Sequence, residues 1–144
     1  MIPRFELEGL RVYGRTTPIL KDITFEILPA EIFAIIGPAG SGKTTLLRLL
    51  NRMIDLEHRK TTITGKVRFE GQDLLRPGLD VPTLRRQVGM VFAVPLPLPM
   101  SIRENITLGL RLAGVPGSDW AGRVESSLQA AALFEEVKDR LDTP

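Results

Sequence analysis

The 144-residue chain contains no cysteine, and it has only one histidine, one tyrosine and one tryptophan. The lack of cysteine excludes disulfide bonds, thiolate catalysis and cysteine-ligated metal sites. Neither sign of charge predominates, because 19 basic side chains are balanced by 17 acidic ones and the net charge is +2. This balance gives no reason to expect nucleic acid or membrane lipid as a partner. We interpret the loose basic stretch as a solvated face; it contains Arg48, Arg52, His58, Arg59 and Lys60.

Long apolar runs are missing as well. No run approaches the roughly 20 apolar residues that a membrane span needs, and the first eight residues lack the apolar region of a secretory signal. We therefore expect a cytoplasmic chain that reaches a membrane only through partners. Its length and its 43% hydrophobic content suit a single domain with a core.

One glycine-rich segment carries most of the functional information. It fits the phosphate-binding pattern G-x-x-x-x-G-K-[ST] and consists of Gly37, Pro38, Ala39, Gly40, Ser41, Gly42, Lys43, Thr44 and Thr45. The apolar run 32–36 before it is typical of a buried strand, and leucines at helical spacing follow it. Strand, loop and helix in this order are the context in which the pattern binds nucleotides. The alternative is a glycine-rich turn with a chance lysine.

The residue types in this segment match what a triphosphate needs. Gly40 and Gly42 allow the backbone to turn its N–H groups inward with no Cβ in the way. The start of the following helix adds the positive end of its dipole. Lys43 has the reach to contact the β- and γ-phosphates, and the Thr44 hydroxyl is the expected Mg²⁺ ligand. The segment therefore predicts a site for ATP and Mg²⁺.

The sequence divides into a β-rich half and a helical half. Apolar alternation predicts strands within 4–36, the first two as an antiparallel pair, and further strands at 61–71 and 88–92. Helices are expected over 44–54 and near 83–87. Prolines at alternate positions in 94–99 indicate an extended linker, and Ser101 and Glu104 have the spacing of a helical capping box. We expect a nucleotide-binding core at 1–92, a linker at 93–100 and a helical subdomain at 101–144.

Six segments carry a family pattern, and they are 37–45, Leu47–Met53, Leu84–Phe92, Pro95–Ile102, Glu104–Ile106 and Val137–Leu141. Together they resemble the ATP-binding subunit of ABC transporters, and within that family the ATPases of bacterial phosphate importers. The Pro-x-Pro-x-Pro-Met-Ser stretch and the sequence Asn-Arg-Met at 51–53 indicate the subfamily. The resemblance implies an α/β fold with a P-loop NTPase core. In that fold a partial parallel sheet is accompanied by antiparallel N-terminal strands and followed by a helical subdomain.

The resemblance implies roles for two more residues. Tyr13 stands where the family places an aromatic ring that stacks on adenine, and such stacking contributes about 1–3 kcal/mol per base in nucleic-acid complexes. Packing at a strand end is the alternative for Tyr13. Ala93 replaces the glutamine of the family's Q-loop, which contacts the Mg²⁺ and water shell and links the nucleotide site to the helical half. An alanine methyl group offers no ligand to metal or water.

The resemblance also implies partners and an activity. A family member binds MgATP between two ATP-binding subunits, and its hydrolysis drives import through transmembrane permease subunits that contact the helical subdomain. The subunit lies on the inner face of the plasma membrane, and the cargo here is expected to be phosphate or another anion. The family's Leu-Ser-Gly-Gly-Gln signature, its Asp-Glu strand end and its switch histidine do not occur in this sequence. We therefore expect a truncated N-terminal part without a complete catalytic set, inactive in hydrolysis by itself.

Two other classes of protein stay open at this point. A small complete P-loop kinase suits the short length, although no second acidic site follows an apolar strand. A non-catalytic nucleotide-binding module is compatible with Ala93. In the truncated case we expect a chain of low stability or one prone to associate, because apolar strand edges beside 32–36 would be left uncovered.

Overall fold

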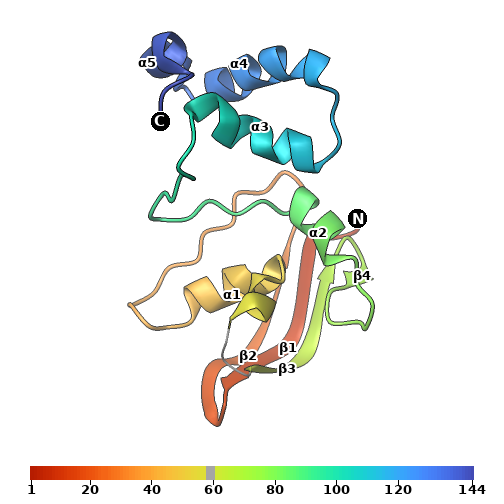
Figure 1. Cartoon of the computed structure of the whole chain (residues 1–144). Coiled ribbons are helices and arrows are strands. Elements are labelled where there is room, and N and C mark those ends of the chain that lie inside the picture. The colour runs from red at the N-terminus through yellow and green to blue at the C-terminus, as the bar shows by residue number, and fades with distance from the viewer. Residues whose placement is uncertain (58–60) are drawn as a thin grey trace. The chain divides into compact units, whose positions relative to one another are not determined.

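The computed structural model of the chain describes residues 1–57 and 61–144 (Figure 1). Its residues group into two compact units, Met1–Val91 and Phe92–Pro144. Part of the basic stretch, His58, Arg59 and Lys60, lies outside the described residues, so its expected solvation stays a prediction.

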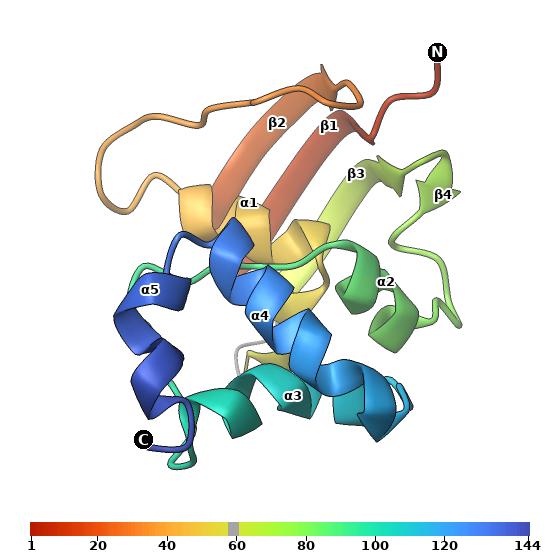
Figure 2. The ribbon, with the colours of Figure 1, turned by 90° about the horizontal axis from the view of Figure 1, so that it is seen from above.

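The first unit is built on an antiparallel sheet. Its strands are β1 (Phe5–Gly14), β2 (Thr17–Ile27), β3 (Thr61–Phe69) and β4 (Gln72–Asp73), in the spatial order β2-β1-β3-β4. β1 pairs with β2, which confirms the antiparallel pair expected at the N-terminus. The helix α1 (Lys43–Leu50) lies across one face of this sheet (Figure 2).

Side-chain alternation along β1 determines which face of the sheet becomes the core. Leu10 and Val12 are fully buried, and they share one cluster with Val67 of β3 and Leu49 of α1. Burial of an aliphatic side chain of this size contributes about 1.5–3 kcal/mol. The first unit is therefore stabilised mainly by the contact between its antiparallel sheet and α1.

β1 and β3 are interrupted by a bulge. Between the pairs Glu8–Lys66 and Arg11–Thr64, two residues of β1 face the single residue Gly65 of β3. Gly65 has a φ of 97°, and a Cβ built on it would lie 2.5 Å from the carbonyl oxygen of Gly9. The two backbones approach so closely here that only glycine fits, which is a common property of bulges.

The helix expected over 44–54 is divided in two. α1 ends at Leu50, and a 3₁₀ turn, η1 (Met53–Leu56), follows Arg52, whose φ of 58° is left-handed. Arg85 of α2 (Val81–Gln87) donates to the carbonyl oxygens of Asn51 at 3.3 Å and Arg52 at 2.7 Å. A guanidinium thus satisfies carbonyl groups just beyond the helix end. The contact joins the Asn-Arg-Met segment to the Leu-Arg-Arg-Gln segment.

The prediction that 32–36 and 88–92 are buried strands was wrong. Neither segment forms a strand, and Ile32, Ile36 and Val91 are 99%, 93% and 98% exposed. Strands of a parallel sheet are buried on both faces and need hydrogen-bonding neighbours. Among the described residues no segment pairs with either run, so the apolar composition alone does not produce a strand.

The second unit is helical. Its elements are α3 (Ile102–Leu112), η2 (Gly117–Asp119), α4 (Trp120–Ala130), α5 (Phe134–Val137) and η3 (Lys138–Arg140). Val124 and Leu128 of α4 are buried together with Val137 of α5. The part of the chain that the structure describes contains no helix both long and apolar enough to cross a membrane.

The start of α3 is capped by its own residues and also binds the C-terminal segment of the unit. The predicted capping box is confirmed, because Glu104 N–H donates to the Ser101 hydroxyl and a Glu104 carboxylate oxygen accepts from Ser101 N–H at 2.8 Å. The Ser101 hydroxyl also donates to that carboxylate oxygen, at 2.8 Å, and the two bonds that Ser101 donates, from its hydroxyl and from its N–H, lower the pKa of Glu104 below its ordinary value. Arg103 donates to both carboxylate oxygens of Asp142, at 2.7 and 3.2 Å, so the C-terminal segment is tied to the same helix end.

Candidate functional site

The glycine-rich segment forms a loop that ends at the first turn of α1, as predicted. Gly42 precedes the helix with a φ of 93°, and a Cβ there would lie 2.7 Å from Leu20 Cδ2 and 3.0 Å from the Ile19 carbonyl oxygen. Gly40 also has a positive φ, 77°, but a Cβ there would meet nothing within 4 Å. Gly42 is therefore required both for its conformation and for the approach of β2, whereas Gly40 is required for its conformation alone.

Lys43 holds the loop in shape. Its ammonium group donates to the carbonyl oxygens of Gly37 and Pro38, each at 2.7 Å, and lies 3.4 Å from the Ser41 hydroxyl. These three acceptors surround the end of a flexible side chain. The lysine is therefore already positioned over the loop, where a phosphate oxygen is expected to lie.

A cavity of about 380 Å³ lies at this loop. It is lined by Ile19, Ala39, Gly40, Ser41, Gly42, Lys43, Thr44 and Thr45. Leu46 N–H is bonded to the Gly42 carbonyl oxygen at 2.9 Å, whereas the amides of the helix's first turn before it have no acceptor within the helix. The cavity therefore combines a lysine ammonium group, hydroxyl groups and helix-terminal N–H groups, a combination suited to an anion.

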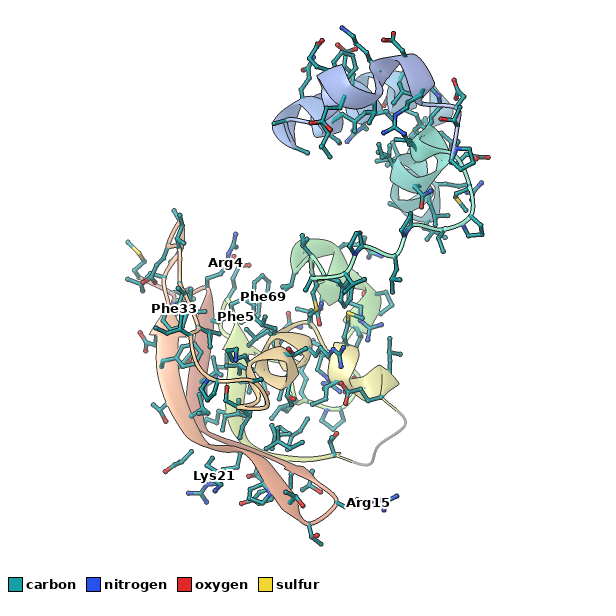
Figure 3. All side chains as sticks on the ribbon, turned by 90° about the vertical axis from the view of Figure 1, so that its left-hand side faces the viewer. Arg4, Phe5, Arg15, Lys21, Phe33 and Phe69 are labelled. Carbon is teal, nitrogen blue, oxygen red and sulfur yellow. The ribbon has the colours of Figure 1, made fainter. Side chains whose placement is uncertain are left out.

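A second cavity, of about 700 Å³, adjoins the first, and Ile19 and Thr45 line both. Its other lining residues are Gly14, Arg15, Thr17, Arg48, Glu57 and Thr61. Figure 3 shows Arg15 at the tip of the β1–β2 hairpin. Arg48 is paired with Glu57 at 2.8 Å. Sequence reasoning missed Ile19 and Glu57 at this place, because contacts across β2 and η1 carry no local sequence signal.

The interpretation of the basic stretch as a solvated face was wrong for Arg52, whereas Arg48 keeps a solvated side chain that is also ion-paired. The Arg48 side chain is 39% exposed and ion-paired, and that of Arg52 is only 19% exposed. Arg52 pairs with Asp55 at 2.8 Å and also donates to the Leu74 carbonyl oxygen. Long basic side chains cover apolar surface with their stems, and here they tie α1 to the segments that follow it.

Tyr13 is not among the residues that line the cavity at the loop. Tyr13 is half-buried in β1, opposite Pro18 and Thr62, and its neighbour Gly14 lines the second cavity. Ala93 is exposed and belongs to the other compact unit. The roles of both residues stay predictions.

Thr44 lines the cavity with an exposed side chain, so its hydroxyl is free to take part in metal binding. Within 1–57 and 61–144, no group of three or more histidine and carboxylate side chains is placed to hold a metal ion. Mg²⁺ is commonly held by one or two protein groups together with substrate phosphates. Thr44 beside the phosphate loop fits that arrangement.

Comparison with known proteins decides the family. A family model described as "ABC transporter" matches residues 20–143. The chain belongs to the ABC transporter family. This match confirms the resemblance predicted from the six segments, and it leaves no support for the alternative of a small P-loop kinase.

Two relatives and one solved structure illustrate the similarity to ABC proteins. The chain is 46% identical over 140 residues to phosphate import ATP-binding protein PstB 1 of Streptococcus pyogenes serotype M3, which covers 96% of the chain and 55% of the relative. It is 47% identical over 137 residues to the protein of the same name from serotype M12, covering 94% and 54%. The chain thus spans about half the length of the curated relatives it matches.

The solved structure supports the fold. The structure of cbiO1 from Clostridium perfringens, described as part of the ABC transporter complex cbiONQ, matches with a TM-score of 0.77 and 23% identity. The match covers 100% of this chain and 55% of that one. The expected fold class, a P-loop NTPase core of the ABC type followed by helices, is confirmed. The partial parallel sheet expected within that core is not formed among the described residues, whose strands all pair antiparallel.

Proposed function

We propose that this chain is the nucleotide-binding part of an ATP-binding subunit of an ABC-type importer, with phosphate or another anion as the cargo. The observation that carries the proposal is the cavity at the loop, where seven of the nine predicted phosphate-loop residues line one space. The likeness to phosphate import ATP-binding proteins supports the cargo class.

The chain's own residues perform the binding. The Lys43 ammonium group exchanges the carbonyl oxygens of Gly37 and Pro38 for phosphate oxygens, because a charged acceptor makes the stronger hydrogen bond. The N–H groups of the loop and of the first turn of α1 bind the remaining phosphate charge. Thr44 would hold Mg²⁺ through its hydroxyl, and the ion would supply positive charge that neutralises the phosphates.

The partners and place of action follow from the same proposal. In the whole protein two ATP-binding subunits enclose MgATP, and the helical unit contacts transmembrane permease subunits, which keep the subunit at the inner face of the membrane. ATP hydrolysis belongs to that assembly. Positioning and electrostatics supply nearly all of the catalysis of phosphoryl transfer, so this chain by itself is expected to bind ATP without appreciable turnover. A non-catalytic module therefore stays a candidate for the isolated chain.

Calorimetric titration of the 144-residue chain with MgATP tests the proposal. We expect saturable binding that weakens when EDTA removes the metal. Thr44→Ala is expected to reduce affinity in Mg²⁺ and to change it little in EDTA, because the hydroxyl acts through the ion. The same loss in both buffers would assign Thr44 a structural role. Absence of saturable binding by the wild type would contradict the nucleotide site itself.

Tyr13→Ala provides a test of base stacking. We expect it to weaken ATP binding by about 5- to 150-fold, corresponding to the stacking contribution of about 1–3 kcal/mol, and to leave inorganic triphosphate binding unchanged, since triphosphate has no ring. Competition titrations with the two ligands measure the difference. Equal losses for both ligands would mean that Tyr13 only supports the β1–β2 hairpin.

A further inference from the structure

The second cavity, of about 700 Å³, has a wall made by parts of the first unit that are far apart in the sequence. The β1–β2 hairpin supplies Arg15, which Figure 3 shows at its tip, and α1 supplies Arg48. Ile19 and Thr45 also line the cavity at the loop, so the two spaces adjoin. A ligand whose phosphates lie at the loop therefore has room in the second cavity for the group that its phosphates carry.

One ion pair belongs to the wall of the second cavity. A guanidinium nitrogen of Arg48 donates to Glu57 Oε1 at 2.8 Å, and the two side chains are 39% and 29% exposed. Among the described residues no donor is bonded to the other carboxylate oxygen, Oε2. An ionised carboxylate accepts up to about four hydrogen bonds, so Glu57 keeps most of its capacity for a ligand.

Glu57 is held at both its backbone and its carboxylate. Its N–H donates to the carbonyl oxygen of Ile54 in η1 at 3.2 Å, and Ile54 is fully buried in the core. Arg48 fixes the other end of the side chain. A side chain that is already ordered loses little conformational freedom when it binds a ligand. Glu57 is therefore a prepositioned acceptor.

The spacing along α1 indicates which part of a nucleotide reaches this acceptor. Thr45, the last residue of the phosphate-binding pattern, and Arg48 are three positions apart on α1. Residues at this spacing share a helix face and are displaced by about 4.5 Å along the helix axis. In a nucleoside triphosphate the ribose is bonded directly to the phosphates, and the base lies one group farther away. The ribose is therefore the group that meets the ion pair.

The chemistry of the ion pair suits a sugar. A carboxylate only accepts hydrogen bonds, and the 2′ and 3′ hydroxyls of ribose are two neighbouring O–H donors. Arg48 also compensates the negative charge of Glu57, so the carboxylate does not strongly repel phosphates bound in the adjoining cavity. A deoxyribose offers fewer donors to the same acceptor.

We propose that Glu57 determines sugar specificity at the nucleotide site: it accepts hydrogen bonds from the ribose hydroxyls and so selects ribonucleotides. Arg48 is a positioning residue, because it acts through the Glu57 carboxylate. The inference rests on the proposed binding of ATP at the loop, and it adds a residue and a selectivity that the phosphate-binding pattern does not specify.

The test titrates the 144-residue chain with the Mg²⁺ complexes of ATP and of 2′,3′-dideoxyATP, which keeps the base and the phosphates but lacks both hydroxyls. The wild type is expected to bind ATP about 10- to 150-fold more tightly than the dideoxy compound, because the lost bonds have a charged acceptor. Glu57→Ala is expected to bring this ratio close to one. Changes that act only on the phosphates or the base cancel in the ratio.

Glu6→Ala is the matched control. Glu6 forms an ion pair with Arg68 at 2.9 Å, and these side chains are 24% and 34% exposed, much like those of the Arg48–Glu57 pair. Glu6 lies on β1 and lines neither of the two cavities. The control therefore removes an equivalent ion pair from the same unit, and it is expected to keep the wild-type ratio of affinities.

Two replacements of Arg48 test its positioning role. Arg48→Ala is expected to lower the ratio severalfold, because the carboxylate is no longer held in place. Arg48→Lys is expected to restore most of it, because an ammonium group still pairs with a carboxylate. A wild-type ratio in Arg48→Ala would overturn this role.

The outcomes also separate this inference from the proposed function. Equal affinity of the wild type for ATP and dideoxyATP, or a wild-type ratio in Glu57→Ala, would overturn the sugar specificity. Binding of inorganic triphosphate by the same protein would show in either case that the phosphate site is intact. A wild-type chain that binds neither ATP nor triphosphate would overturn the proposed function, and the sugar specificity with it.

Discussion

Gly65→Ala is expected to destabilise the first unit by about 3 kcal/mol or more, through a steric clash and backbone strain together. The added Cβ would lie 2.5 Å from the Gly9 carbonyl oxygen and 2.7 Å from its carbonyl carbon. These are backbone atoms of the neighbouring strand, so no side-chain rotation relieves the contact. The φ of 97° adds strain of its own, because side chains with a Cβ rarely adopt it.

The expected loss is large compared with the whole stability of a domain, about 5–15 kcal/mol. For a unit of this size it corresponds to a fall in the midpoint of thermal unfolding of roughly 12 °C or more. Thermal unfolding followed by circular dichroism measures this fall. Gly71→Ala is the matched control, since Gly71 also has a positive φ, 80°, but a Cβ there would meet nothing within 4 Å.

The control separates the two causes. Gly71→Ala is expected to cost only the conformational strain, about 1–2 kcal/mol, so its midpoint falls much less. If both variants unfolded at the same temperature, the close approach of β1 and β3 at the bulge would not be what excludes a side chain at position 65. One of the two strands would then shift enough to accommodate the Cβ.

Lys43→Ala is expected to weaken MgATP binding by about 10- to 150-fold, because hydrogen bonds to charged groups contribute about 1.5–3 kcal/mol. In the absence of nucleotide the ammonium group makes hydrogen bonds of 2.7 Å to two loop carbonyl oxygens. Those bonds are exposed to water, so their loss is expected to change the unfolding temperature little. We therefore expect this variant to bind MgATP more weakly than the wild type while unfolding at nearly the same temperature.

Isothermal titration with MgATP measures the affinity, and Lys21→Ala provides the control. Lys21 is an exposed lysine of β2, and Figure 3 shows it away from Phe33 and Phe69. Lys21→Ala removes the same positive charge from the chain as Lys43→Ala does, but it leaves the phosphate loop unchanged. A wild-type affinity for Lys43→Ala, or an equal loss in both variants, would mean that net charge and not the position of Lys43 governs binding.

Local patterns in the sequence were sufficient to predict the phosphate loop and the capping box. The loop's residues are neighbours in the chain, so their spacing brings the glycines at 40 and 42 and the lysine at 43 to the same cavity. The same holds for Ser101 and Glu104, three residues apart at a helix start. Short-range geometry of this kind is encoded by spacing alone.

Tertiary structure alone decided the state of the apolar segments and the surroundings of the loop. The composition of 32–36 indicates a strand, but a strand exists only when another segment offers it hydrogen bonds, and that partner is not local. In the same way, Arg85 reaches the end of α1, Gly65 lies against Gly9 and Ile19 joins the phosphate cavity only after distant parts of the chain have packed together. Contacts across long sequence separations leave no periodic signal, which is why the sequence specified the chemistry of the site but not the surfaces around it.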